Sequence, residues 1–90
     1  MERPQITLYG RPGCELCTTT EEIVRDLMVK NGFDRPLAIV NIEDDPALHA
    51  RLLAQIPALE VAGTLLPLAV SPMQIAAHLR LGAGRGNGEH

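Results

Sequence analysis

The sequence predicts an α/β domain: a mixed four-stranded sheet with three flanking helices, in the order βαβαββα. Short apolar runs alternate with segments of helical periodicity along the chain, which favours this class. A helix separates the first two predicted strands, so they are expected to pair in parallel through a right-handed crossover. A single glycine, Gly63, separates the last two strands, which predicts an antiparallel hairpin.

The composition suits one small domain with an aliphatic core. The chain has 90 residues, of which 46% are hydrophobic. Tyr9 and Phe33 are its only aromatic residues, so aliphatic side chains must supply the core. We expect the domain to cover residues 1–81 and the glycine-rich residues 82–90 to form a disordered tail.

The charge and the hydropathy pattern argue against two classes of function. The net charge of −3, without a run of Lys or Arg, argues against a nucleic-acid surface. No apolar run reaches about 18 residues, the length that indicates a membrane span. The first predicted strand begins so early that it leaves no room for a signal peptide. We therefore expect a cytoplasmic protein whose thiols are normally kept reduced.

The N-terminal third contains one strand and one long helix. The strand is expected at Gln5–Tyr9, followed by a loop over Gly10–Gly13. The helix is expected over Cys14–Lys30 and is ended by Asn31-Gly32. The side chains expected on its buried face are Leu16, Thr20, Ile23, Val24, Leu27 and Met28.

The middle of the chain contains a strand and a shorter helix. Leu37–Ile42 is a nearly continuous apolar run, which is typical of a strand buried on both faces. Asp45 is the predicted N-cap of the second helix, and Pro46 suits its first position. This helix is expected to end near Gln55, because Ile56 precedes a proline and is pushed toward extended geometry.

The C-terminal part is a hairpin followed by a third helix. The hairpin strands are expected at Ala58–Ala62 and Thr64–Leu68. Ser71-Pro72 opens the helix with a capping residue and a proline at the first helical position. The helix is expected to reach Leu81.

The two cysteines are the main chemical feature of the chain. Cys14 and Cys17 stand two residues apart at a strand-to-helix junction, where a dithiol can carry out redox chemistry. Cys14 is expected to cap the helix, where free backbone N–H groups and the positive end of the helix dipole favour a thiolate. Cys17 lies one turn further on, within disulfide reach. A structural disulfide is not expected in a reducing compartment, so the pair is interpreted as redox active.

This motif and one proline resemble a known family. The stretch Tyr9–Cys17 resembles the glutaredoxin active-site segment, in which a basic residue stands three positions before the first cysteine of Cys-x-x-Cys. Ile56-Pro57 falls where the thioredoxin fold places its cis-proline. Over about Gln5–Leu81 the chain is similar to the glutaredoxin-like family of the DUF836 type. The resemblance implies a thioredoxin-like fold with a cis Ile56–Pro57 peptide bond.

The resemblance implies a thiol–disulfide oxidoreductase that reduces protein or small-molecule disulfides and takes part in cell redox homeostasis. Cys14 is the expected nucleophile that forms a mixed disulfide, and Cys17 is expected to resolve it. Arg11 would add a cation beside Cys14, while the adjacent carboxylate of Glu15 would oppose it. The Ile56 backbone, presented by Pro57, is expected to pair with an extended substrate.

The chain departs from glutaredoxins in two places that concern glutathione. Glu15 and Leu16 stand between the cysteines, where glutaredoxins usually have a proline and an aromatic residue. Leu66–Ser71 replaces the Gly-Gly-x-Asp segment that holds glutathione. These departures argue against glutathione as the natural reductant. The glutathione system is kept as one candidate electron donor, and thioredoxin reductase is the other. No tightly bound cofactor and no metal are expected, and the expected partner is a disulfide-bearing protein or small molecule.

Other interpretations of the dithiol stay open. A structural zinc site usually needs four ligands, whereas one cysteine pair is present and His49 and His78 fall on separate predicted helices. Some glutaredoxins bridge an iron–sulfur cluster between subunits, usually with a single cysteine and bound glutathione. A non-catalytic binding module would keep the fold and use the dithiol to hold a metal or to sense oxidation. Disulfide reduction that is lost in Cys14→Ser would distinguish an enzyme from such a module.

Overall fold

The computed structural model describes residues 5–33 and 36–87, the last six of them (82–87) by their backbone alone. Its elements in chain order are β1 (Ile6–Gly10), α1 (Glu15–Lys30), β2 (Leu37–Asn41), the 3-10 helix η1 (Ile42–Asp44), α2 (Pro46–Leu52), β3 (Ala58–Val61), β4 (Thr64–Leu66) and α3 (Pro72–Asn87). The predicted α/β class and element order are confirmed. Within the described ranges, no helix has the length and apolar character needed to cross a membrane.

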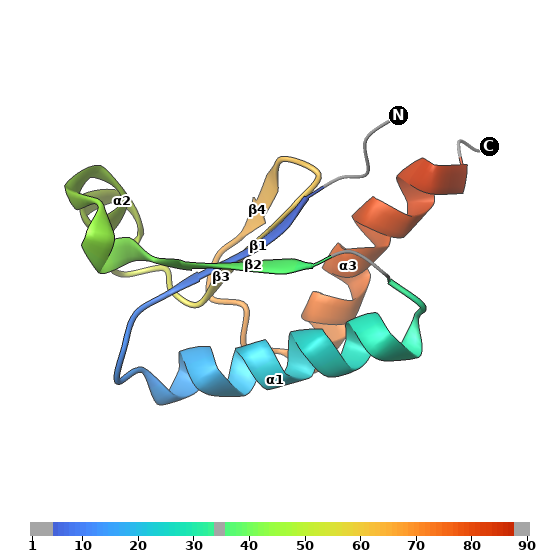
Figure 1. The fold of residues 1–90 in the computed structure, drawn as a ribbon, viewed down its shortest axis with the longest axis horizontal. Helices are drawn as coiled ribbons and strands as arrows, with labels where there is room; N and C mark the ends of the chain where they lie inside the picture. The colour runs from blue at the N-terminus through green and yellow to red at the C-terminus, as the bar shows by residue number, and fades with distance from the viewer. Residues whose placement is uncertain (1–4, 34–35, 88–90) are drawn as a thin grey trace.

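The four strands form one mixed sheet in the order β2-β1-β3-β4. β1 and β2 are parallel, with Ile6 opposite Leu37. β3 runs antiparallel to both β1 and β4. The carboxyl ends of β1 and β2 therefore lie at the same end of the sheet, and the chain turns there from β1 into α1 (Figure 1).

Two helices cover one face of the sheet. α1 and α3 lie on the same side of the strands, whereas α2 lies beyond the end of the sheet (Figure 1). The core fills the space between the sheet and these two helices, because alternate strand residues face them. Its buried members are Ile6, Leu8, Val24, Met28, Leu59, Val61, Ala69, Ile75 and Leu79. All of them are aliphatic or methionine, as the composition predicts.

The local signals at two helix starts are confirmed. The Asp45 side chain accepts a hydrogen bond from the Ala47 N–H at 2.9 Å, and Pro46 occupies the first turn of α2. The Ser71 hydroxyl accepts one from the Gln74 N–H at 3.3 Å at the start of α3. Each cap satisfies a backbone donor that the helix itself leaves without a partner.

The hairpin between β3 and β4 is also confirmed, but its strands are shorter than predicted: β3 ends at Val61 instead of Ala62, and β4 ends at Leu66 instead of Leu68. The turn consists of two residues. Ala62 and Gly63 both have positive φ angles, +53° and +82°. Positive φ at both central residues is typical of the type I′ turn, whose twist matches that of the flanking strands.

The prediction that Leu37–Ile42 is buried on both faces is wrong. β2 is an edge strand with half-buried residues, and Ile39 is 48% exposed. Among the strands, α1 contacts mainly β1 and α3 contacts mainly β3, so the helix-facing side of β2 is only partly covered, although Leu37 packs against the core. The fully buried Ile42 belongs to η1 instead of the strand. An apolar run does not distinguish an edge strand from a central one, because neighbouring strands are set by the topology.

Two helix boundaries differ from the predicted ones. α2 ends at Leu52 instead of near Gln55, because the Gln55 N–H donates to the Leu52 carbonyl at 2.8 Å in a tighter three-residue turn. α3 continues past Leu81 to Asn87. Each added helical residue gains one hydrogen bond, so glycines weaken such an extension without forbidding it. The division into a domain over 1–81 and a tail over 82–90 stays a prediction, and residues 88–90 lie outside the described part.

Candidate active site

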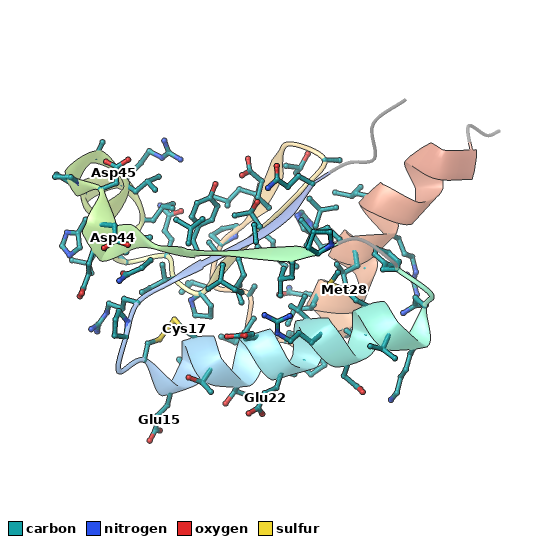
Figure 2. The ribbon with its side chains drawn as sticks, in the orientation of Figure 1. Glu15, Cys17, Glu22, Met28, Asp44 and Asp45 are labelled. Carbon is teal, nitrogen blue, oxygen red and sulfur yellow. A yellow bond between two sulfur atoms is a disulfide. The ribbon has the colours of Figure 1, made fainter. Side chains whose placement is uncertain are left out.

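The two cysteines form a disulfide at the start of α1. Cys14 and Cys17 are bonded, with their Cα atoms 5.2 Å apart. The pair lies beside the carboxyl end of β1, where the chain enters α1 (Figure 2). Figure 2 also shows Cys17 turned toward the sheet and Glu15 turned away from it. The carboxylate of Glu15, which stands between the two cysteines in the chain, therefore points into solvent on the other side of the helix.

Cys14 is the N-cap of α1, as the sequence predicts. Its sulfur accepts a hydrogen bond from the Cys17 N–H at 3.1 Å, and its carbonyl accepts one from the Thr18 N–H at 3.1 Å. Cys14 is partly exposed, whereas Cys17 is only 8% exposed. Cys14 is therefore the more exposed of the two cysteines, and its sulfur also lies at the positive end of the helix dipole.

Gly10 lies against the buried sulfur. A Cβ atom at this position would be 3.0 Å from the Cys17 sulfur and 3.1 Å from its Cβ. Gly10 itself is buried at the end of β1. The absence of a side chain there leaves room for Cys17 to pack against the strand.

The Ile56–Pro57 segment is held beside α1 by two linked hydrogen bonds. The peptide bond between Ile56 and Pro57 is cis, as the resemblance implies. The Pro57 carbonyl accepts from the Ala69 N–H at 2.7 Å, and the Ala69 carbonyl accepts from the Thr20 hydroxyl at 2.7 Å. Pro57, Ala69 and Thr20 are all buried. The Ile56 N–H and carbonyl have no hydrogen-bond partner among the described residues.

A groove of about 240 Å³ lies between α1 and β2, and Cys17 forms part of its lining. Arg11 lies on its rim and is exposed, and it has no ion-pair partner in the part of the chain that the structure describes. Glu21 also lines the groove, but its carboxylate is paired with Arg25 at 3.0 Å. The lining is completed by Leu8, Gly10, Pro12, Cys17, Thr18, Ile39 and Asn41.

Tyr9 lies next to the active-site loop on the opposite face of the sheet from Leu8. Its hydroxyl donates to the Glu60 carboxylate at 2.8 Å. Burial raises the pKa of Tyr9 above its usual value, and the hydrogen bond and negative charge of Glu60 raise it further, while Arg51 opposes them. Tyr9 is therefore a structural contact between β1 and β3.

The sequence-predicted residues divide into two groups in space. The structure brings Cys14 and Cys17 together and places Arg11 on the adjoining groove. Ile56 and Pro57 connect to α1 through Ala69, on the side of Thr20. Metal ligands do not gather here: no three of the described His, Cys, Asp and Glu residues lie close enough to hold an ion.

Sequence reasoning did not identify two residues that position the dithiol and its neighbouring loop. Thr20 was expected only on the buried helix face, although a polar residue among apolar ones is a signal for a buried hydrogen bond. The sequence pattern predicts a loop at Gly10, although a glycine at a strand end is a signal for a close approach of the backbone.

Comparisons with known proteins agree with this geometry. The family model of the glutaredoxin-like domain (DUF836) matches residues 5–80. The X-ray structure of a protein from X. campestris is similar, with a TM-score of 0.69, 26% identity, and coverage of 84% of this chain and 96% of that one. The solution NMR structure of a protein from Nitrosomonas europaea has a TM-score of 0.56 and 30% identity, and the match covers 68% and 69% of the two chains. None of the curated proteins compared matches the chain.

Proposed function

The chain belongs to the glutaredoxin-like (DUF836) family, and from this premise we propose that it is a thiol–disulfide oxidoreductase that reduces protein or small-molecule disulfides through Cys14 and Cys17. The predicted thioredoxin-like fold is confirmed, and it supplies the scaffold for this chemistry. The observation that carries the proposal is the Cys14–Cys17 pair at the helix start, with the Cys14 sulfur accepting the Cys17 N–H.

The geometry supports Cys14 as the nucleophile. In the reduced protein, the Cys17 N–H and the helix dipole would stabilise a thiolate at Cys14. Cys14 is also the more exposed of the two cysteines. Cys17 is bonded to Cys14 and is only 8% exposed, which suits a resolving cysteine.

The reaction proceeds in two exchange steps. The Cys14 thiolate attacks one sulfur of the substrate disulfide, a Cys14–substrate disulfide forms, and the other substrate sulfur leaves as a thiolate that takes up a proton. The Cys17 thiolate then attacks the Cys14 sulfur, and the second substrate sulfur leaves in the same way. Two electrons pass to the substrate, and the protein is left with the Cys14–Cys17 disulfide.

We assign substrate binding to the Ile56–Pro57 segment, which is anchored to α1 through Ala69 and Thr20. The free N–H and carbonyl of Ile56 suit pairing with an extended chain that carries the disulfide. Pro57 is buried and anchored through Ala69, so it holds Ile56 in place. Arg11, without an ion-pair partner among the described residues, supplies a cation beside the dithiol for an anionic group or for the Cys14 thiolate.

The catalytic cycle requires an external two-electron reductant to reopen the Cys14–Cys17 disulfide. The candidates are glutathione and thioredoxin reductase, in a cytoplasmic setting where such reductants are present. The chemistry needs no tightly bound cofactor, because the dithiol carries both electrons.

A redox titration tests the proposal. The metal-free protein is equilibrated in glutathione buffers of graded ratio, trapped by alkylation and weighed by mass spectrometry. We expect one two-electron transition between about −180 and −270 mV, the range of known oxidoreductases. Turnover in a disulfide-reduction assay should be lost in Cys14→Ser, while Cys17→Ser should accumulate the mixed disulfide at Cys14.

The control variant is Thr19→Ser, an exposed position on α1 outside the motif, which should behave like the wild type. If the Cys14–Cys17 bond forms at no ratio, or if Cys14→Ser still turns over, the dithiol mechanism is refuted. Metal binding by the reduced pair, without turnover, would favour the binding module instead.

A further inference from the structure

Three exposed apolar side chains lie on the first turn of α1 and on the loop that contacts this helix, and the proposed chemistry gives them no role. Leu16 lies on α1 between the cysteines and is 59% exposed. Leu68 and Val70 lie on the loop between β4 and α3 and are 53% and 44% exposed. We call these three residues the apolar rim.

One hydrogen bond brings the loop that carries Leu68 and Val70 against α1, the helix that carries Leu16. The Thr20 hydroxyl donates to the carbonyl of Ala69, the residue between Leu68 and Val70. Leu16 lies four positions before Thr20, so both occupy one face of α1, with Leu16 one turn nearer the helix start. The loop therefore meets α1 next to the turn that carries Leu16 and the disulfide.

The loop of the apolar rim is held in place by its main chain. The Leu68 N–H donates to the Gln55 carbonyl at 2.9 Å, and the Ala69 N–H donates to the Pro57 carbonyl at 2.7 Å. The Val70 N–H closes the loop on the Leu68 carbonyl at 2.8 Å. These bonds join the apolar rim directly to the segment on either side of Ile56. The surface is therefore preformed, and a ligand does not have to order it.

Leu68 has a conformation that its main-chain hydrogen bonds support but that burial of its side chain does not explain. Its φ angle is +51°, in the left-handed region that a leucine adopts only at a cost and that a glycine adopts freely. Leu68 is 53% exposed, so burial of its side chain offsets little of this conformational cost. Backbone strain that presents an exposed apolar side chain beside reactive groups points to a contact with another molecule.

The chemistry of the apolar rim favours one class of substrate over another. Neither its three residues nor the loop from Pro67 to Ser71 carries a charge. Glutathione has two carboxylates and an ammonium group, which need charged or polar partners when they are bound. The apolar rim supplies none, and Arg11, on the groove that Cys17 lines, can meet only one of the carboxylates. The open N–H and carbonyl of Ile56 lie next to the loop and suit an extended main chain.

We propose that the apolar rim selects polypeptide disulfides that carry an apolar side chain next to the reacting cysteine, in preference to oxidised glutathione, with Leu68 as the main determinant. This inference rests on the proposed function. The polypeptide pairs with the Ile56 backbone, and its apolar side chain packs against Leu16, Leu68 and Val70 while its disulfide meets Cys14.

The experiment compares three disulfides under single-turnover conditions. The pre-reduced protein is mixed with oxidised glutathione or with one of two disulfide-linked peptides that differ only in Leu or Ser beside the cysteine. Samples are quenched with acid and the products are quantified. We expect the leucine peptide to react about tenfold faster than the serine peptide, which corresponds to about 1.4 kcal/mol, and faster than oxidised glutathione.

Variants identify the residues responsible. Leu68→Ser and Leu68→Gly should each reduce the leucine-to-serine rate ratio to about two or below, and Leu16→Ser should reduce it in part. The matched control is Val29→Ser, since Val29 is 77% exposed on α1 and lies about 18 Å from Cys17 along the helix. Val29→Ser should leave the ratio unchanged.

The outcomes distinguish failure of the proposed selectivity from failure of the proposed oxidoreductase activity. Equal rates for the two peptides, or a faster reaction with oxidised glutathione, overturn the proposed selectivity while the oxidoreductase activity stands. A ratio that falls equally in Val29→Ser and Leu68→Ser also overturns it. No reduction of any of the three disulfides overturns both proposals.

Discussion

The buried hydrogen bond between Thr20 and Ala69 is predicted to matter most for holding the loop of the apolar rim against α1. The test substitution is Thr20→Val, which keeps the shape of the side chain and replaces the hydroxyl with a methyl group. Threonine and valine have similar helix propensities, so the helix itself is little affected. The change therefore removes one donor and leaves the Ala69 carbonyl without its partner.

The expected magnitude follows from burial at both ends of the bond. Thr20 is 1% exposed, Ala69 is 0% exposed, and the oxygens are 2.7 Å apart. A buried polar group left without a partner costs about 1–3 kcal/mol. In a domain of this size, each kcal/mol lowers Tm by about 4–8 °C, so we expect a decrease of roughly 5–20 °C.

The assay is thermal and urea unfolding followed by circular dichroism, with the oxidised and reduced forms measured separately. The neighbouring threonine supplies a matched control, because Thr19 is exposed and takes the same substitution. Thr19→Val should change the free energy of unfolding by no more than about 0.5 kcal/mol. Amide hydrogen exchange at Leu68 should also become faster in Thr20→Val, because the loop loses its anchor on α1.

Two results would refute this reasoning. If Thr20→Val and Thr19→Val have the same Tm, the buried hydrogen bond contributes nothing to stability. If Thr20→Val is destabilised but the protection of the Leu68 amide is unchanged, the bond does not hold the loop.

Three further predictions concern other contacts of the site and its scaffold. Gly10→Ala places a methyl group about 3.0 Å from the Cys17 sulfur. It should lower the free energy of unfolding in urea by about 1–3 kcal/mol and shift the redox midpoint of the dithiol. If neither quantity changes, the end of β1 moves to accommodate the methyl group without cost. Tyr9 is the only tyrosine, so ultraviolet titration of tyrosinate reports it alone: its midpoint should lie above the usual pH of about 10, and Glu60→Gln should lower it. Because the folded pKa is raised, this contribution to stability is complete below pH about 10 and is lost as the pH rises through the folded pKa. Asp45→Ala removes the N-cap of α2 and should lower the free energy of unfolding by about 1 kcal/mol, seen as a lower urea midpoint at unchanged slope. An unchanged midpoint would mean that water replaces the cap.

Features that depend on near neighbours in the chain were predictable from the sequence. The capping position of Cys14, the caps at Asp45 and Ser71, and the hairpin at Gly63 all involve residues within a few positions of one another. The cis peptide bond before Pro57 was predicted through the resemblance instead of from local chemistry.

Features that depend on distant contacts were not predictable in the same way. Leu16 belongs to the apolar pattern of α1, yet it is exposed because the first turn meets the strand end through Cys17. The apolar run of β2 predicted burial on both faces, but the strand lies at the edge of the sheet. The left-handed backbone of Leu68 has no signal in the sequence, because leucine does not favour it.

The sequence by itself determined the dithiol, its place at a helix start and the order of the elements, because spacing, caps and periodicity act over one or two turns of chain. Only the tertiary structure decided what surrounds the dithiol. Thr20 and Ala69 are 49 positions apart, and their contact sets the loop that carries Leu68 beside α1. Contacts of this length form when the sheet and helices pack together, and so they depend on the whole fold instead of on any one segment.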